Sequence, residues 1–461
     1  MKLLCISNGH GEDVIALRIL NALQRHASAL DQSWQISALP ISGTGRVYQS
    51  NDIPIIGPVK TLPSGGFLNR DLKQLSRDVN QGLLSLTRQQ LRAITTWANG
   101  AASPSSSSTQ NSAILAVGDI VPLLFARLSK QPYHFIGTAK SEYWLRDERG
   151  KIPASNLTGK LEGWSGSVYL PWERWLMSSD RCQSIFVRDT LTAQYLQKLG
   201  IHATYAGNPM MDSLTPTGAL TPLLKHLQHS AQNTTQRQTA KSPSASPTAS
   251  SKATALYVTP KQQPTHPLII TLLPGSRPPE AYQNWQRILT AIPSLSQAFS
   301  NRSLILLGAI APSLSHPKLT NPLTNSHNDT WTPLPAPYPT FSQKNVTLSL
   351  INNAYSDCLH ESEIAIATAG TATEQFVGLG KPAITLPGPG PQFTNAFATV
   401  QAKMLGPSIQ LLKDPTQTGE TIKKILSDPD RLQLIYQNGT HRMGQPGAAD
   451  RIAQKLLEAM N

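Results

Sequence analysis

Short apolar runs alternate along the chain with stretches in which apolar residues recur every three or four positions. The run from Lys2 to Ile6 predicts a buried strand, and apolar residues at 14, 15, 17, 19, 20 and 23 predict a helix from Val14 to Leu23. Further strands are expected in the first half at Ile36–Leu39, Ile53–Ile56, Ile114–Val117, Tyr133–Gly137 and Ser184–Val187, with helices at Leu72–Trp97 and Leu191–Leu199. The second half repeats the pattern, with strands expected at Leu268–Leu273, Ser303–Leu307, Val346–Leu350, Ile364–Thr368 and Ala383–Leu386. This alternation predicts an α/β fold built on parallel sheets.

Three polar segments interrupt this pattern. Ala101–Ser112 is a Ser-rich insert, and Leu214–His266, which contains no Asp or Glu, is expected to be a disordered basic linker. Pro312–Lys344 is rich in Pro, Asn, Ser and Thr and is expected to be a long loop, with too few apolar residues for a strand or a core helix. The chain is therefore expected to hold two doubly wound domains, at residues 1–213 and 267–445, followed by a C-terminal helix within 446–461.

The charge balance indicates an anionic partner. The chain of 461 residues has 40 Lys and Arg against 27 Asp and Glu, a net charge of +13. Nucleic acid, a phosphorylated ligand and a lipid headgroup all fit such a charge. Nucleic acid is disfavoured, because the sequence has no signature of an RRM, a KH domain or a helix-turn-helix. Five of the positive charges lie in the linker, at Lys225, Arg237, Lys241, Lys252 and Lys261. The rest of the chain therefore has a net charge of +8.

Cysteine usage and hydropathy exclude other classes. Cys5, Cys182 and Cys358 are widely spaced and form no CxxC pair, so neither a disulfide framework nor a zinc module is supported. The start of the chain has too few consecutive apolar residues for the core of a signal peptide. The longest apolar stretch, Ala113–Ala126, is too short for a membrane span. A cytosolic protein with at most surface contact to a membrane is expected.

Two first-half motifs offer chemistry. In SNGHGEDVIA, Ser7–Ala16, Gly9 and Gly11 allow a tight turn before a helix, and His10, Glu12 and Asp13 are candidates for a general base, with helix capping by an acid as the alternative. Asp119 follows the predicted strand Ile114–Val117, where either a catalytic or a capping carboxylate fits. A further segment, YAGNPMMD at Tyr205–Asp212, suits a sharp turn between domains.

Anion-binding motifs follow strands in the second half. LLPGSRPPE delivers Gly275, Ser276 and Arg277 to a strand end, where Arg can grip a diphosphate. IATAGTATEQF joins a strand to a helix start, so the N–H groups near Gly370, Thr371 and Thr373 face an anion, while Glu374 or Gln375 can reach a ribose diol. Further on, LPGPGPQFTNAFATVQ presents Gln392 and Asn395, whose amides can bond sugar hydroxyls or cap the next helix.

These motifs together resemble a known family. LLPGSR, AGTATE, AGNPMMD and a glycine loop ending in an acid resemble lipid-A-disaccharide synthase and its relatives, glycosyltransferases of the GT-B type. QFTNA is also similar to the QxxNA of the peptidoglycan GlcNAc transferases. The resemblance runs in matching order from Ser7 to about Gly406. It implies two Rossmann-like domains facing a central cleft and a UDP-sugar bound mainly by the second. It further implies an acylated acceptor on the first and inverting transfer without a metal or other cofactor.

The resemblance also implies residue roles. It puts Ser276 and Arg277 on the diphosphate and Asp13 and Asp119 on the acceptor side. Phosphate and donor contacts are implied for Gly370, Thr371, Thr373, Gln392 and Asn395. The chain departs from the family in having GHGED where the synthase has a GExSGD-like loop, and in holding Gln375 where the family has an acid, one residue after Glu374. The general base is therefore open between His10 and Asp13, and the acceptor is not fixed.

Two other functions stay open. One is an enzyme similar to UDP-GlcNAc 2-epimerase, which shares the fold and the UDP site, and the other is an inactive nucleotide-sugar-binding protein. An aromatic segment of the first domain is either core or a surface for acyl chains and an anionic membrane. It comprises Tyr143, Trp144, Leu145, Trp164, Tyr169, Trp172 and Trp175, with Lys140, Arg146, Arg149, Lys151 and Lys160 nearby.

Overall fold

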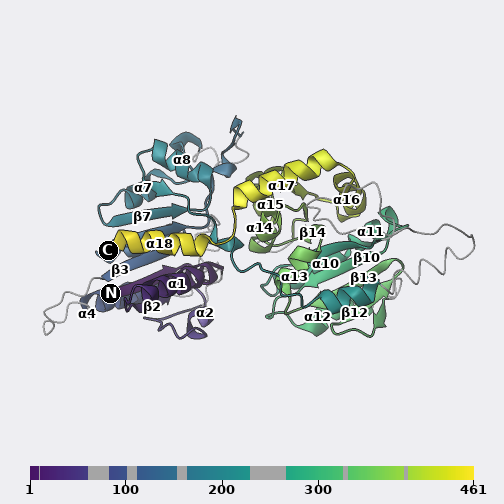
Figure 1. Ribbon diagram of the computed structural model, residues 1–461, viewed down its shortest axis with the longest axis horizontal. Coiled ribbons are helices and arrows are strands. Elements are labelled where there is room, and N and C mark those ends of the chain that lie inside the picture. The colour runs from purple at the N-terminus through teal and green to yellow at the C-terminus, as the bar shows by residue number, and fades with distance from the viewer. Residues whose placement is uncertain are drawn as a thin grey trace, which may run out of the picture. The chain divides into compact units, whose positions relative to one another are not determined.

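The computed structural model describes residues 1–9, 11–60, 83–100, 112–152, 163–228, 266–324, 331–388 and 393–460. The chain forms two compact units, one of Met1–Asp212 with Met443–Asn461 and one of Ser213–Arg442. Each unit contains a largely parallel β-sheet with helices packed on it (Figure 1). The predicted α/β fold class is confirmed.

The first unit is built on a six-stranded sheet with the order β2-β1-β3-β4-β7-β8, in which all neighbouring strands are parallel. Its central strands are buried along nearly their whole length because helices cover both faces of the sheet. The strands are β1 (Lys2–Ser7), β2 (Gln35–Pro40), β3 (Ser112–Gly118), β4 (Tyr133–Gly137), β7 (Cys182–Val187) and β8 (Ala203–Thr204), with a separate pair β5 (Arg146–Asp147) and β6 (Gly150–Lys151).

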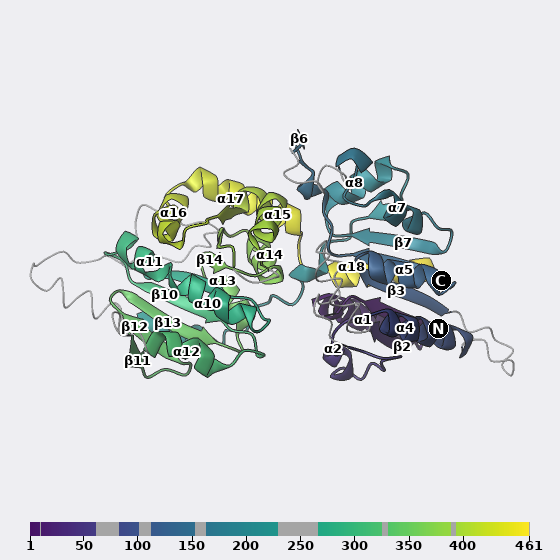
Figure 2. The same cartoon turned by 180° about the vertical axis from the view of Figure 1, so that it is seen from behind.

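Connections between parallel strands are right-handed, so helices lie on both faces of a sheet whose strand order runs in both directions from β1. The helices are α1 (Gly11–Ala29), α2 (Arg46–Gln49), α4 (Leu83–Gly100), α5 (Ile120–Leu128), α7 (Pro171–Met177), α8 (Thr190–Lys198) and α18 (Ala448–Met460), with 3₁₀ turns η1 (Glu142–Trp144) and η2 (Pro209–Met211). Figures 1 and 2 show α1 and α18 on one face and α5 and α7 on the other.

The C-terminal helix α18 belongs to the first unit and packs against α1. Its start is capped by Asp212, which closes the YAGNPMMD segment. Asp212 Oδ1 accepts from the N–H groups of Gly447 at 2.6 Å and Ala448 at 3.1 Å, and Oδ2 accepts from Ala449 at 2.7 Å. This carboxylate therefore satisfies three N–H groups that a helix start leaves without partners.

The second unit contains an eight-stranded sheet with the order β11-β12-β13-β10-β9-β14-β15-β16. The six strands from β13 to β16 in this order are parallel, and β11 and β12 extend the sheet antiparallel. The strands are β9 (Leu268–Leu273), β10 (Leu304–Ala309), β11 (Thr332–Leu334), β12 (Thr340–Gln343), β13 (Val346–Ile351), β14 (Ile364–Ala367), β15 (Ala383–Thr385) and β16 (Ile409–Leu411). The helices are α10 (Glu280–Leu289), α11 (Ile292–Ala298), α12 (His316–Thr324), α13 (Tyr355–Glu361), α14 (Thr371–Gly378), α15 (Asn395–Leu405), α16 (Thr418–Leu426) and α17 (Pro429–Met443), with 3₁₀ turns η4 (Gly406–Ser408) and η5 (Pro415–Gln417).

The structure corrects the loop expected at Pro312–Lys344. This segment contains the helix α12 and the strands β11 and β12. Leu319 and Leu323, four residues apart, are buried on one face of α12, and the indole N–H of Trp285 donates to the Leu319 carbonyl at 2.9 Å. A few apolar residues at helical spacing are enough here, because an existing core receives them.

The first part of the expected linker is also folded. Residues 221–228 are helical, and Leu214, Leu220, Leu223, Leu224 and Leu227 are each at most 5% exposed. Residues 229–265 lie outside the described residues, as do the Ser-rich insert at 101–111 and the first part of the helix expected at Leu72–Trp97.

One predicted strand is wrong. Ile53–Ile56 forms only an isolated parallel bridge between Ala38 and Ile55. Pro54 lies within this run and has no N–H to donate to a sheet, so pairing does not extend along it. None of the helices in the described ranges has the length and hydropathy needed to cross a bilayer.

Candidate active site

Three of the predicted anion-binding motifs meet at one edge of the second sheet. Leu273, Ala367 and Thr385 are register partners at the carboxyl ends of β9, β14 and β15. The loops that leave these strands therefore begin side by side. This is the edge at which open α/β sheets bind ligands.

The loop after β9 carries Gly275, Ser276 and Arg277. Ser276 is exposed, and its carbonyl accepts a hydrogen bond from the Ser313 hydroxyl at 2.7 Å. Arg277 is half-buried, and its carbonyl accepts the N–H of Ala281 at 2.9 Å, just inside α10. The backbone of this loop is thus fixed from two sides.

The loop after β14 ends at the start of α14. Gly370 is the N-cap residue of this helix, and no side chain caps it. Thr371 follows as the first helical residue and is exposed. The Gly370 carbonyl accepts from Gln401 Nε2 of α15 at 3.0 Å. A helix start without a side-chain cap presents N–H groups and the positive end of the helix dipole to an anion.

Thr373 and the two polar residues after it are turned inward. The Thr373 hydroxyl is fully buried and donates to the Ala369 carbonyl at 2.5 Å. Gln375 is buried and accepts from the Tyr355 hydroxyl at 2.7 Å. Glu374 is also buried, 8% exposed. Of the two threonines, Thr371 is the exposed one.

The third loop leads to α15. Asn395 is exposed at the first position of α15, which Thr394 caps by accepting the Phe397 N–H at 3.2 Å. Gln392 lies outside the described residues. The Phe393 N–H donates to Glu280 Oε1 at 2.7 Å, which ties this loop to the start of α10.

Asn284 lies beneath all three loops and was not predicted. Its Nδ2 donates to the Pro274 carbonyl at 3.1 Å and the Thr368 carbonyl at 3.3 Å. A Cβ built on Gly388 would lie 2.2 Å from Asn284 Oδ1, so the third loop approaches the same side chain. Asn284 is 2% exposed, one turn after the buried Glu280 on α10. A polar pair four residues apart on an otherwise apolar face is the signal in the sequence that would have found it.

The glycine motif of the first unit follows β1, but the helix after it, α1, begins at Gly11, three residues before the predicted helix start at Val14. Gly9 has φ +115°, and a Cβ built there would lie 2.1 Å from the Ser42 carbonyl oxygen, so only glycine fits. Gly11 and Glu12 begin α1 and are half-buried, and the Glu12 N–H donates to the Gly9 carbonyl at 3.2 Å. His10 lies outside the described residues.

Asp13 is held in a buried polar network. Ser7 donates its hydroxyl hydrogen to Asp13 Oδ1 at 2.6 Å, and the Tyr48 hydroxyl lies 2.7 Å from the same Ser7 oxygen. Because Ser7 has one hydrogen to give, Tyr48 is the donor to Ser7. Burial raises the pKa of Tyr48 well above its ordinary value, which keeps this hydroxyl protonated. Asp13 itself is 3% exposed.

Asp119 lies at the carboxyl end of β3 and is the N-cap of α5. Its carboxylate accepts the Val121 N–H at 2.8 Å, which is the geometry expected of a carboxylate that caps a helix. Its own N–H donates to Asn8 Oδ1 at 3.4 Å, which joins the end of β1 to the end of β3. Burial raises the pKa of Asp119, against the opposing effects of the Val121 N–H, the Asn8 side chain and Lys140. Asp119 is half-buried, and a carboxyl with a raised pKa is suited to accept a proton.

The aromatic segment divides between core and surface. Tyr143, Trp144, Leu145 and Tyr169 are each at most 8% exposed, as the core alternative requires. Trp164, Trp172 and Trp175 are 81%, 52% and 63% exposed, as the surface alternative requires. Of the cations nearby, Lys140 donates to Glu173 Oε2 at 2.6 Å and Arg146 pairs with Glu142 at 2.9 Å, so both support the buried part.

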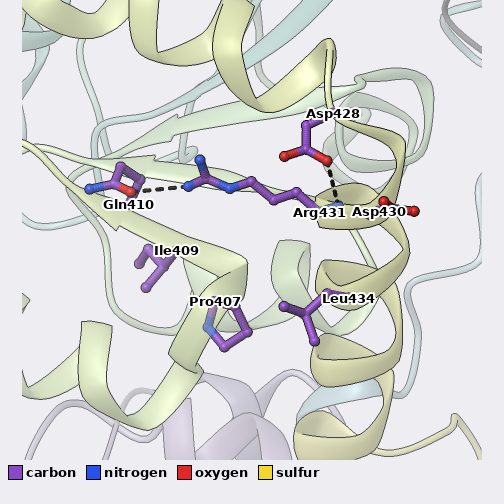
Figure 3. Close-up of a pocket in the computed structure, with 7 residues that line it drawn as sticks. All are labelled: Pro407, Ile409, Gln410, Asp428, Asp430, Arg431 and Leu434. Atoms are coloured by element: carbon purple, nitrogen blue, oxygen red, sulfur yellow. Dashed lines mark hydrogen bonds between the residues drawn. The ribbon is translucent and has the colours of Figure 1, made fainter.

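A surface hollow of about 510 Å³ lies elsewhere in the second unit (Figure 3). Arg431 crosses it to donate to Gln410 Oε1 at 3.1 Å. The hollow is lined by Pro407, Ile409, Gln410, Asp428, Asp430, Arg431 and Leu434. This lining includes the first residues of β16, at the amino edge of the sheet, and contains none of the predicted site residues. Within the described ranges, no three His, Cys, Asp or Glu side chains are grouped so as to hold a metal ion.

No protein-family model and no curated protein matches the sequence. Solved structures do match over nearly the whole chain. A putative UDP-N-acetylglucosamine 2-epimerase from Listeria monocytogenes aligns with TM-score 0.52 and 12% identity over 100% of this chain and 95% of its own. MurG from Acinetobacter baumannii aligns with TM-score 0.50 and 12% identity over 99% of both chains. The S. aureus MnaA-UDP co-structure aligns with TM-score 0.51 and 12% identity over 100% of this chain and 97% of its own.

The fold is of the GT-B type. Two Rossmann-like units built on parallel sheets are common to this chain, MurG and the epimerases. At these identities the likeness is one of fold, and it does not distinguish a transferase from an epimerase.

Proposed function

We propose that the protein is an inverting glycosyltransferase that moves a sugar, GlcNAc-like, from a UDP-sugar donor to a lipid-linked or acylated acceptor. The observation that carries the proposal is the meeting of the Arg277 loop and the uncapped start of α14 at adjacent strand ends. A cation beside a helix start suits the diphosphate of a nucleotide sugar. The solved structures of similar fold include proteins named for UDP-GlcNAc and UDP.

On the donor side, Arg277 holds the diphosphate together with the exposed residue Thr371 and the N–H groups that begin α14. These groups stabilise the charge that develops on UDP as the bond to the sugar breaks. Asn395, exposed at the start of α15, and Gln392 bond hydroxyls of the donor. Glu374 remains the candidate for the ribose diol.

On the acceptor side, Asp119 accepts the proton of the attacking hydroxyl. Asp119 is preferred to Asp13 because Asp119 is half-buried with a raised pKa, whereas Asp13 is 3% exposed and already bonded to Ser7. Asp13 and the glycine loop then shape the site around the acceptor. His10 is the third candidate for the base.

Calorimetric titration with UDP tests the donor site. Arg277→Ala should weaken UDP binding by about ten- to a hundredfold, as expected for the loss of charge-assisted hydrogen bonds. Arg431→Ala is the matched control, because it removes an arginine from the hollow at the opposite sheet edge. Unchanged UDP affinity in Arg277→Ala, or a loss only in Arg431→Ala, would contradict the assignment.

A second candidate function is epimerisation of a UDP-sugar, favoured by the fold shared with the Listeria protein, which is named as a putative UDP-N-acetylglucosamine 2-epimerase. An epimerase needs no acceptor. Incubation of the protein with UDP-GlcNAc alone, followed by chromatography, would yield an epimer from an epimerase and no epimer from the proposed transferase. UDP binding with no turnover on either UDP-GlcNAc alone or membrane lipid extracts would indicate an inactive nucleotide-sugar-binding protein.

A further inference from the structure

Three exposed tryptophans lie close together in the sequence of the first unit. Trp164, Trp172 and Trp175 are 81%, 52% and 63% exposed. Tryptophan is a large, mostly buried residue in folded proteins, so three exposed indoles within twelve residues call for an explanation. We refer to Trp164, Trp172 and Trp175 with the exposed Leu124 and Leu128 of α5 as the tryptophan surface.

The inner side of α7 is firmly held, which fixes the tryptophans on its outer side. Glu173, Leu176 and Met177 are buried, and Glu173 accepts from Lys140 Nζ at 2.6 Å. Trp172 and Trp175, three residues apart, share the opposite face of the helix. They are therefore held outward by packing within the unit.

Contacts of Arg174 and Arg127 join the neighbouring parts of the surface to α7. Arg174 donates to the Ser165 carbonyl at 3.0 Å, which holds the residue after Trp164 against α7. The guanidinium of Arg127, on α5, lies 5.5 Å from the centre of the Trp175 ring. Figure 2 shows α5 and α7 on the same face of the sheet, and the two helices pack together.

Leu124 and Leu128 extend the apolar area along α5. They are 39% and 51% exposed, and they lie one helical turn apart on either side of Arg127 in the sequence. Leucine side chains at this spacing share a helix face. The tryptophan surface thus spans two adjacent helices.

The charges around this surface are mainly positive. Residues 120–130 contain Arg127 and Lys130 and no acid, and Lys130 is exposed. Residues 163–181 contain Arg174 and Arg181 against Glu173 and Asp180, and Glu173 is paired with Lys140. No indole N–H of the three tryptophans donates to another of the described residues, so these donors are available to an outside acceptor.

The geometry points to docking of the tryptophan surface on a lipid bilayer that contains anionic lipids. Indole rings favour the headgroup region, where the ring is apolar and the N–H can bond a carbonyl or phosphate oxygen. The cations of α5 and its following turn complement anionic headgroups, as does the +13 charge of the chain. Docking would bring the first unit to the surface that carries a lipid-linked acceptor, and in this respect it extends the proposed function.

Vesicle co-sedimentation of the full chain tests the docking surface. Wild-type protein should bind vesicles of phosphatidylcholine with phosphatidylglycerol, bind vesicles of phosphatidylcholine alone more weakly, and lose affinity as salt is raised. The double variant Trp172→Ala/Trp175→Ala should bind the anionic vesicles at least about tenfold more weakly, because two interfacial indoles are lost. Leu30→Ser/Leu199→Ser is the control, since these two leucines are exposed in the same unit and outside the surface.

A second double variant separates loss of binding from loss of folding. Trp172→Phe/Trp175→Phe keeps the apolar shape and should retain part of the vesicle binding, with a melting temperature close to wild type. Equal binding by wild type and the Trp172→Ala/Trp175→Ala variant would overturn the proposal, as would no binding by wild type. A wild-type dimer that the double variant converts to monomer, without vesicle binding, would assign the surface to a second copy and overturn the bilayer. UDP affinity measured in parallel is expected to be unchanged, so failure of the docking surface is distinguishable from failure of the donor site.

Discussion

The side-chain amide of Asn284 donates to the carbonyl oxygen of Thr368 at 3.3 Å, and so joins helix α10 to the loop that begins α14. The same Nδ2 donates to the Pro274 carbonyl at 3.1 Å, in the loop that carries Arg277. Two loops that bring candidate ligand contacts from distant parts of the sequence thus share one buried support. Asn284 thus links the two loops beyond the pairing of β9 with β14, and we expect it to help fix the position of Arg277 relative to the start of α14.

Asn284→Ala should therefore weaken both the fold and the site. Two buried carbonyls lose their donor, which should lower the free energy of unfolding by about 1–3 kcal/mol. UDP affinity should fall as well, because the two loops are no longer fixed to each other. Urea unfolding and calorimetric titration with UDP measure the two effects.

A conservative variant separates positioning from packing. Asn284→Asp keeps the volume but replaces the Nδ2 donor with an oxygen that repels the two carbonyls, so its UDP affinity should fall at least as far as that of Asn284→Ala. Wild-type UDP affinity in both variants would show that the loops hold their positions without Asn284.

The alternation of apolar runs and helical patterns is sufficient to predict most of the strands. Leu268–Leu273 and Tyr133–Gly137 have the predicted bounds, and α18 lies within the predicted range 446–461, because each is an uninterrupted apolar or amphipathic run. The helix α12 was missed, since Leu319 and Leu323 stand among Pro, Asn and Thr and are recognisable as core residues only against Trp285. The local sequence pattern thus identifies helices and strands with uninterrupted apolar runs, whereas an element with few apolar residues is recognisable only from its packing.

The candidate site shows the same division. The ligand-facing motifs are contiguous in the sequence, so Gly275 to Arg277 and Gly370 to Thr371 are recognisable from local spacing and turn chemistry. Their supports act across long separations: Asn284 contacts Thr368 from 84 residues away, and Asn8 contacts Asp119 from 111 residues away. Such contacts follow from the strand order and cannot be predicted from any short segment of the sequence.

The raised pKa of Asp119 makes the base assignment testable through pH. A general base works in its deprotonated form, so transfer should fall as pH drops through the pKa of Asp119, which burial raises above the ordinary value of 3.8. Asp119→Asn should lower kcat by about 10²- to 10⁴-fold and remove this acidic limb. The profile of kcat/KM against pH, measured with an acceptor from lipid extracts, provides the check.

The same profile distinguishes the other two candidates. An acidic limb that persists in Asp119→Asn and is lost in His10→Gln would assign the base to His10. Activity of Asp119→Asn at the wild-type level would leave Asp119 as a helix cap alone.

Tyr48→Phe isolates the support of Asp13. The substitution removes the hydroxyl that lies 2.7 Å from Ser7 Oγ and leaves the hydrogen bond from Ser7 to Asp13 in place. We expect a loss of about 0.5–1.5 kcal/mol in the free energy of unfolding and a fall in kcat of a few-fold. Asp13→Asn should lower kcat further than Tyr48→Phe if Asp13 contacts the acceptor. Equal effects of the two variants on stability and kcat would instead indicate a structural role for the whole network.

Asp357 on α13 holds the segment that was expected to be a linker. Its Oδ2 accepts from the N–H of Thr217 at 3.1 Å and from the Thr217 hydroxyl at 2.8 Å, and its Oδ1 accepts from the Gly218 N–H at 2.6 Å. Burial alone would raise the pKa of Asp357, but these donors outweigh it and hold the pKa below the ordinary 3.8. The ionised carboxylate therefore stabilises the fold.

Asp357→Asn should accordingly lower the free energy of unfolding by about 2–3 kcal/mol at pH 7, because an amide cannot accept all three donors. The folded pKa lies below the unfolded one, so this stabilisation is fully present above about pH 4 to 5 and is lost as pH falls through the folded pKa. Urea unfolding of both proteins at pH 7, 5 and 3.5 should show an equal difference at the first two values and a smaller one at the third. Asp414→Asn is the control: Asp414 also has a pKa lowered by a backbone donor, Thr416, but it caps an exposed turn, so its removal should cost less stability. A difference for Asp357→Asn that is absent at pH 7, or that grows as the pH falls, would contradict the role of the ionised carboxylate.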